Sequence, residues 1–160
     1  MARIKFKGLQ EYEVKLSKLA ANSREIAGQA IYIAADIVAD AVKEAIEALP
    51  VDENYGTHDK KSHGIKQIQK DGLIDSWGIS QMRDDQGFYN VKLGFDGYNG
   101  LKTQGHPSGQ PNQMIARAVE SGTTFSDKIP FVRPAVNASK ARAEKAMVET
   151  LDEEINKIMD

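Results

Sequence analysis

A long run of patterned apolar residues between Asn22 and Leu49 constrains the fold of this chain more than any other feature. Its apolar side chains recur at steps of three and four and form two adjacent stripes on one helical face. The first stripe comprises Ile26, Ala30, Ile33, Ile37, Ala41 and Ala45, and the second Ala34, Val38, Val42, Ile46 and Leu49. We expect a helix of about 40 Å, widely buried and ended by Pro50. Charged residues such as Asp36 and Asp40 interrupt the run, which excludes a membrane span.

The residues before this run predict two further elements. One helical face carries Leu9, Tyr12, Leu16 and Leu19. Asn22 followed by Glu25 has the spacing of a capping box, so we expect the long helix to begin anew there. Residues 3–6 alternate between polar and apolar and predict a short strand, which Gly8 closes.

Two alternating stretches predict strands at about 73–80 and 89–96, each with a mostly apolar face at the odd-numbered positions. The four residues Asp84–Gly87 between them have the composition of a tight hairpin turn. We therefore expect an antiparallel hairpin that packs its apolar face on the long helix.

The remaining segments complete an α+β fold. A short helix is predicted at Met114–Val119 and a long final helix at Ala135–Ile158. The polar stretches 51–71 and 97–111 are predicted loops, long enough to be mobile or functional. A chain of 160 residues fits one domain, so we expect residues 1–160 to form a single unit in which the two long helices pack on the small antiparallel sheet.

Composition narrows the classes of function. The formal charge of −2 gives no basic surface of the kind that binds nucleic acid. The chain has no cysteine, which excludes disulfides and thiolate chemistry and is compatible with the cytosol or a virion. No long apolar run follows the first residues, so we expect no signal peptide.

The segment Glu120–Ala135 combines a turn, an extended stretch and a helix start. Gly122 tolerates a positive φ, Pro130 favours extended backbone before it, and Pro134 suits the first turn of a helix. We interpret this frame as a rigid apolar wedge that contacts another subunit, with the alternative that Phe131 fills the core of its own chain. The expected contact residues are Glu120, Gly122, Thr123, Pro130, Phe131, Val132, Arg133 and Pro134.

No pattern in the sequence predicts catalysis. His58, Asp59 and His63 are close in sequence but lack the spacing and further ligands of a tetrahedral metal site, so we interpret them as a solvated loop. A metal-dependent hydrolase that uses these three residues is the weaker alternative. Ser121 lacks the glycines of a nucleophile elbow, and the glycine patterns of nucleotide-binding loops are missing. We expect neither enzymatic activity nor a cofactor.

The final helix carries its charges in an unusual order. Its first half holds Lys140, Arg142 and Lys145, and its second half holds Glu149, Asp152, Glu153 and Glu154. The helix dipole favours the reverse order, by about 0.3–1 kcal/mol per charge. The strip is either a solvated face or a surface that meets an oppositely charged strip on a neighbouring subunit in a head-to-tail ring.

Several short motifs follow one another in a characteristic order. They are Gly8-Leu9, the alanine-rich helix ending at Leu49-Pro50, Gly72–Ile79, the strand Tyr89–Phe95, Glu120–Thr123 and Ile129–Ala135. This order resembles the tail-completion or neck family of long-tailed bacteriophages, also described as head–tail joining proteins or tail components. Glu-x-Gly-Thr and Pro-Phe-x-Arg-Pro-Ala are the sharpest motifs. Ser121 departs from the aromatic or aliphatic residue usual in the first, and the segment 53–70 is longer than the usual loop.

The resemblance implies a structural virion protein. Such subunits form a ring, with six-fold symmetry favoured over twelve-fold, that links the head connector or stopper to the tail terminator or tail tube. DNA passes through the ring without sequence-specific binding. The expected location is the head–tail interface of the virion, and the host cytoplasm during assembly. A tail terminator or tail-assembly factor of similar fold is the alternative that the resemblance leaves open.

Overall fold

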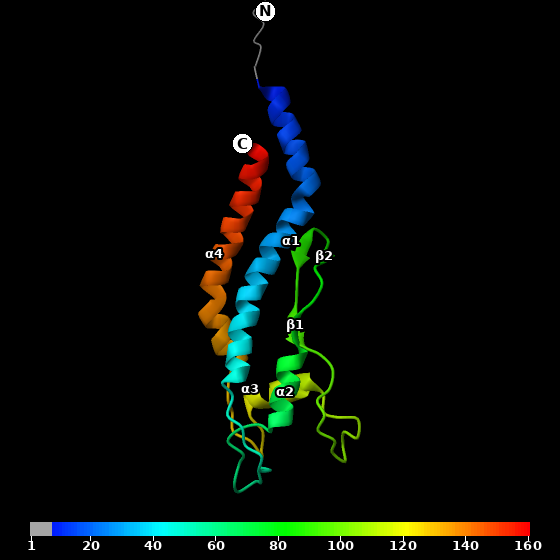
Figure 1. The fold of residues 1–160 in the computed structure, drawn as a ribbon, viewed down its shortest axis with the longest axis vertical. Helices are drawn as coiled ribbons and strands as arrows, with labels where there is room; N and C mark the ends of the chain where they lie inside the picture. The colour runs from blue at the N-terminus through cyan, green and yellow to red at the C-terminus, as the bar shows by residue number, and fades with distance from the viewer. Residues whose placement is uncertain (1–7) are drawn as a thin grey trace, which may run out of the picture.

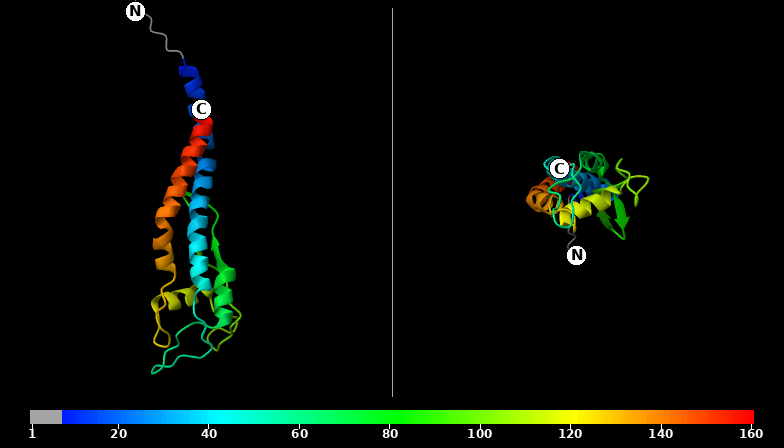
Figure 2. Two further views of the ribbon diagram at one scale, coloured as in Figure 1. Left: turned by 60° about the vertical axis from the view of Figure 1, so that its left-hand side comes forward. Right: turned by 90° about the horizontal axis from the view of Figure 1, so that it is seen from below.

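The computed structural model describes residues 8–160 and has an α+β fold that is elongated along one axis (Figure 1). Two long antiparallel helices, α1 (Leu9–Glu47) and α4 (Val132–Met159), lie side by side. Two short helices, α2 (Gln67–Ser76) and α3 (Asn112–Ser121), gather with the loops at one end (Figure 2). We call this end the base, together with the ends of α1 and α4 that pack on it, and we call α1 up to residue 41 and α4 from residue 139 the arm. The predicted strand at 3–6 lies outside the described residues.

Helix α1 runs without interruption for 39 residues, so the predicted new start at Asn22 is wrong. A capping residue matters only where the preceding backbone is not helical. Here the residues before Asn22 are mostly good helix formers and continue the same apolar spacing, so the helix passes through. It starts after Gly8, whose φ is 96°, and ends at Glu47, shortly before Pro50.

The predicted hairpin forms, but it is divided into two short ladders. β1 (Trp77–Ile79) pairs antiparallel with β4 (Leu93–Phe95), and β2 (Arg83–Asp85) pairs with β3 (Phe88–Asn90). The register shifts by one residue between the two ladders, because three residues (80–82) join β1 to β2 whereas two residues (91–92) join β3 to β4. The extra residue forms a bulge between β1 and β2. At the tip, Gln86 and Gly87 have φ of 57° and 91°, the two positive values of a type I′ turn.

The strand predicted at 73–80 is wrong for its first four residues, which form the last turn of α2. The backbone N–H of Lys66 donates to Gln69 Oε1 at 3.1 Å, which caps the start of this helix inside a stretch predicted as loop. Leu73 is fully buried, and Trp77 lies four residues later on the same side. An alternating pattern this short fits a helix equally well.

The main cluster of the hydrophobic core lies in the base, while Ile26, Ala30, Ala35 and Ala143 are buried in the arm. It consists of Val42, Ile46, Leu49, Ile65, Leu73, Ile115, Ala116, Val119 and Phe131. Trp77 and Phe95 extend it, with their ring centroids 4.8 Å apart, and Phe131 packs edge-on against Phe95 at 6.2 Å. Trp77 Nε1 also donates to the Ala39 carbonyl at 2.9 Å, which fixes the hairpin on α1 as predicted.

Backbone hydrogen bonds join the loops to the base. Ser62 is the centre of one set: its N–H donates to the Phe125 carbonyl at 3.0 Å, and its carbonyl accepts from Asp127 N–H at 2.9 Å. Asn99 N–H donates to the Gln110 carbonyl at 2.9 Å and closes the segment 97–111. Among the helices that the structure describes, none has both the length and the apolar character needed to cross a membrane.

Candidate assembly surfaces

Glu120 joins the end of α3 to the start of α4. Its Oε2 accepts hydrogen bonds from the backbone N–H groups of Phe131 and Val132 at 2.8 and 2.9 Å, and its Oε1 accepts from Arg133 N–H at 3.2 Å. The first N–H groups of a helix have no partner inside the helix and carry partial positive charge, so a carboxylate is well suited to them. We call this arrangement the Glu120 clasp.

Pro134 completes the clasp by having no N–H to satisfy. It is the third residue of α4, whereas the sequence predicted a helix that starts at Ala135. The next donor, Ala135 N–H, reaches the Phe131 carbonyl at 3.4 Å, so the helix start leaves none of these donors without a partner. The two sharpest motifs of the sequence are therefore two halves of one structural unit.

The clasp shifts the pKa of Glu120 downward. Burial raises the pKa, but the three backbone donors and the positive charge of Arg133 outweigh this effect and hold it below the usual value of 4.5. The carboxylate is therefore ionised at neutral pH, the form that accepts these bonds most strongly.

Gly122 and Thr123 shape the turn that follows α3. Gly122 has a φ of 73°, and a side chain there would lie 3.0 Å from the backbone nitrogen of Lys128. Thr123 Oγ1 accepts from the N–H groups of Phe125 and Ser126 at 3.1 and 3.0 Å. Both residues thus have a local structural role that returns the chain toward α4.

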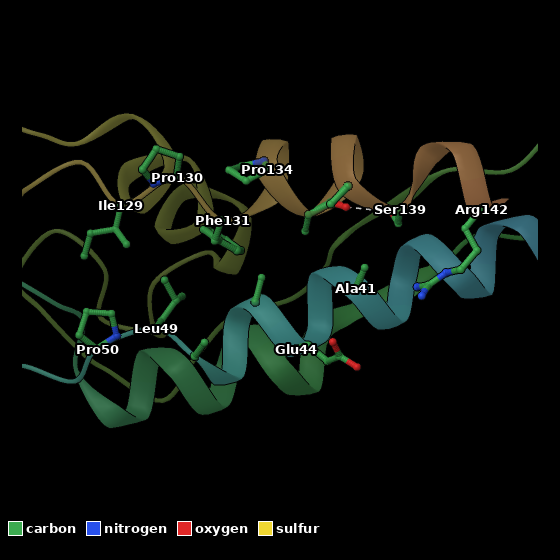
Figure 3. Close-up of a pocket in the computed structure, with 14 residues that line it drawn as sticks. Ala41, Glu44, Leu49, Pro50, Ile129, Pro130, Phe131, Pro134, Ser139 and Arg142 are labelled. Carbon is green, nitrogen blue, oxygen red and sulfur yellow. Dashed lines mark hydrogen bonds between the residues drawn. The ribbon is translucent and has the colours of Figure 1, made fainter. Parts of the chain in front are cut away.

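Phe131 lies in the core of its own chain with 3% of its surface exposed, which matches the second of the two interpretations drawn from the sequence. Pro130, Arg133 and Pro134 are exposed. Pro130 and Pro134 line a groove of about 600 Å³ between the start of α4 and the end of α1, with Arg142 at its far end (Figure 3). This groove keeps part of the predicted contact set accessible.

The three residues of the possible metal site do not form one cluster. His63 Nδ1 lies 2.5 Å from Asp127 Oδ2, whereas His58 pairs with Asp59 at 3.6 Å on the surface. Within residues 8–160 no three His, Asp or Glu side chains are placed to hold a metal ion. Asp52 nearby accepts hydrogen bonds from the backbone N–H groups of Asn54 and His63, and these bonds lower the pKa of its carboxyl group to about 2. Asp52 therefore stabilises the conformation of this loop.

The free end of the arm exposes apolar side chains, three of which, Leu9, Tyr12 and Leu16, lie on the helical face predicted from the sequence. Lys15 Nζ donates to the Met159 carbonyl at 2.6 Å, so the residues of α1 before it project past the end of α4 (Figure 1). Leu9, Tyr12, Val14 and Leu16 are 59%, 54%, 54% and 44% exposed. In Figure 1 no other described helix or strand lies alongside the turns of α1 before Lys15.

Along the arm, α4 and the β-hairpin are the described elements that pack on α1, which leaves apolar side chains partly exposed along its length. Ile33, predicted to be buried, is 42% exposed, and Val148 is 53% exposed. In the part of the chain that the structure describes, the ion pairs of α4 side chains, such as Lys140–Glu144 and Lys145–Glu149, lie within that helix. Within the described residues no ion pair connects α1 to α4.

Comparisons of the chain with models of protein families, with curated proteins and with solved structures gave no match.

Proposed function

We propose that this chain is a structural subunit of a bacteriophage particle that forms a ring at the head–tail junction. The observation that carries the proposal is the arm, whose exposed apolar side chains extend from Leu9 on α1 to Val148 on α4. Exposed apolar surface of this kind marks sites of protein–protein contact. The phage assignment rests on the resemblance of the ordered motifs to the neck family.

The clasp supports a structural role for those motifs. Glu120 and the segment from Pro130 to Pro134 are held by hydrogen bonds that fix the angle between α3 and α4. A subunit that packs repeatedly against identical copies needs a rigid frame, because each error in angle is repeated around the ring. The proposed role needs neither catalysis nor a cofactor.

In this proposal the ring joins the head connector or stopper to the tail terminator or tail tube, with six-fold symmetry favoured over twelve-fold. The projecting turns from Leu9 to Leu16 and the loops 51–66 and 97–111 are the surfaces offered to these partners. DNA passes through the channel without sequence-specific contacts. In this proposal the protein is located in the host cytoplasm during assembly and at the head–tail interface of the finished virion.

The test is a phage that lacks this gene, together with mass spectrometry of purified wild-type virions. The proposal predicts that the protein is present in virions and that its loss leaves filled heads and tails unjoined. Absence from the virion combined with failed tail formation would support the tail-assembly factor instead. Normal particles without the protein would contradict both functions.

A further inference from the structure

The two edges of the arm carry surfaces that complement each other. α4 lies on one side of α1 and the β-hairpin lies on the other, in Figure 1 and in the view from below in Figure 2. One edge therefore presents the outer face of α4, and the opposite edge presents α1 beside the hairpin. Such an arrangement suits a head-to-tail contact, in which two different surfaces of the same chain meet.

The α1 edge contains a groove of about 790 Å³, which we call the α1 groove. Gly28, Tyr32 and Ile33 from α1 and Met82 from the hairpin form its apolar floor. Tyr32 is fixed there because its hydroxyl accepts from Met82 N–H at 2.8 Å. The groove is therefore held by the fold and is apolar at its centre.

Charges lie at the two ends of the α1 groove. Asp36 lines the end nearer the base, and Asp40 is exposed one turn further on. Arg24 lines the end nearer the free end of the arm, which we call its tip. Glu25 beside it reduces the positive charge there. The groove is thus clearly acidic only toward the base.

The outer face of α4 has the matching order. Ala141, Lys145, Val148 and Asp152 recur at steps of four and three and form one exposed stripe. Val148 is 53% exposed, and the side chain of Lys145 is 77% exposed. From base to tip, the stripe therefore runs from basic through apolar to acidic.

The two surfaces lie at the same height along the arm. α1 and α4 are antiparallel, with Lys15 near Met159 at the tip and Ala41 beside Ser139 at the base. Counted residue by residue from these two anchors, Val148 lies level with the stretch of α1 from Ile26 to Tyr32, which lines the α1 groove. Lys145 lies level with the stretch from Gln29 to Ala35, on the side of Val148 toward Asp36.

We propose that the outer face of α4 of one copy docks in the α1 groove of the next copy, with the arms parallel and side by side. Val148 enters the apolar floor, while Lys145 faces Asp36 of the neighbour. The occupant is a second copy because both halves of the contact, apolar and charged, occur on this one chain at one height. The contact rests on the proposed ring and specifies how its subunits meet.

The charges predict an alternating assembly that can be built by mutation. An α4-reversed variant carries Lys145→Glu, and an α1-reversed variant carries Asp36→Lys. Each variant alone places like charges opposite each other at every contact, which opposes association. In an equal mixture, each copy of one variant finds opposite charges on both neighbours of the other variant.

Native mass spectrometry of the purified proteins tests this contact. The wild type should form the ring, each variant alone should lose it, and the mixture should recover it with equal numbers of the two variants. A control with Lys61→Glu makes the same charge change as the α4-reversed variant, but in a loop offered to the head and tail partners and not to a neighbouring copy. Without those partners it should assemble as the wild type does. Circular dichroism should show that all variants remain folded.

Three results would overturn the contact. One is a normal ring from either variant alone, and another is a mixture in which folded variants remain apart. In both cases a wild-type ring found in virions would leave the proposed function standing. A wild-type protein that stays monomeric and is absent from virions would overturn the function as well.

Discussion

The base and the arm of this molecule obtain their order in different ways. In the base, side chains from α1, α2, α3 and α4 converge, and residues such as Leu73 and Phe131 are almost completely buried. In the arm, two helices share one seam, and side chains such as Ile33 and Val148 remain about half exposed. We infer that the base holds the fold together, whereas the arm is built to be completed by other protein surfaces.

The largest effect should follow from Phe131→Ala. This change removes a ring buried in the base core and should lower the free energy of unfolding by about 3–5 kcal/mol. Urea denaturation of the purified protein measures the loss. The matched control is Phe88→Ala, because Phe88 is 77% exposed at the hairpin and should change stability by less than about 0.5 kcal/mol. Equal losses from the two variants would contradict the contrast between base and surface.

Gly56→Ala tests how tightly the loop 51–66 is held in the base. A Cβ at this position would lie 1.7 Å from the Phe125 carbonyl oxygen, so the backbone must move. We expect a loss of about 1–3 kcal/mol in thermal or urea unfolding. Gly78→Ala is the control, since no atom lies within 4 Å of its added Cβ. If the stability of Gly56→Ala equalled that of the wild type, the backbone of this loop could not be held as close to Phe125 as 1.7 Å from an added Cβ requires.

Glu120→Gln should cost about 1–2 kcal/mol at pH 7, because it removes the charge of the clasp and one of its two acceptor oxygens. The folded-state pKa is lowered, so the ionised carboxylate stabilises the fold above about pH 4.5. That contribution is lost as the pH falls through the lowered value. Urea midpoints measured across this range should therefore converge for wild type and variant in acid. A constant difference at every pH would argue against the clasp.

The smallest effect is expected on the arm. Lys145→Ala breaks only a solvent-exposed pair with Glu149, 3.6 Å apart, and should change the free energy of unfolding by less than about 0.5 kcal/mol. The same variant should weaken assembly, since Lys145 belongs to the proposed contact. A large loss of stability in the monomer would show that these charges serve the fold instead.

The sequence predicted the elements whose signals are local and repeated. The α1 stripes, the turn at Gln86 and Gly87, and the final helix all follow from spacing or from backbone preference. It was misled where two patterns coincide, as in the four residues from Leu73, whose alternation also fits a helical turn.

The Glu120 clasp could not be foreseen from spacing alone. Its donors lie 11 to 13 residues further along the chain, and nothing in that interval shows that the turn brings them back to the carboxylate. The exposure of Leu9 and Leu16 was missed for a related reason. An apolar helical face predicts that something covers it, but does not say whether that partner belongs to the same chain.

Hydrogen exchange, measured on the assembled wild type and on the α4-reversed variant, tests most directly whether the arm is the surface that assembly completes. Assembly should add protection along residues 24–36 of α1 and 141–152 of α4, while the protection of α2 and α3 stays the same. Added protection confined to the base, with an unchanged arm, would contradict this expectation.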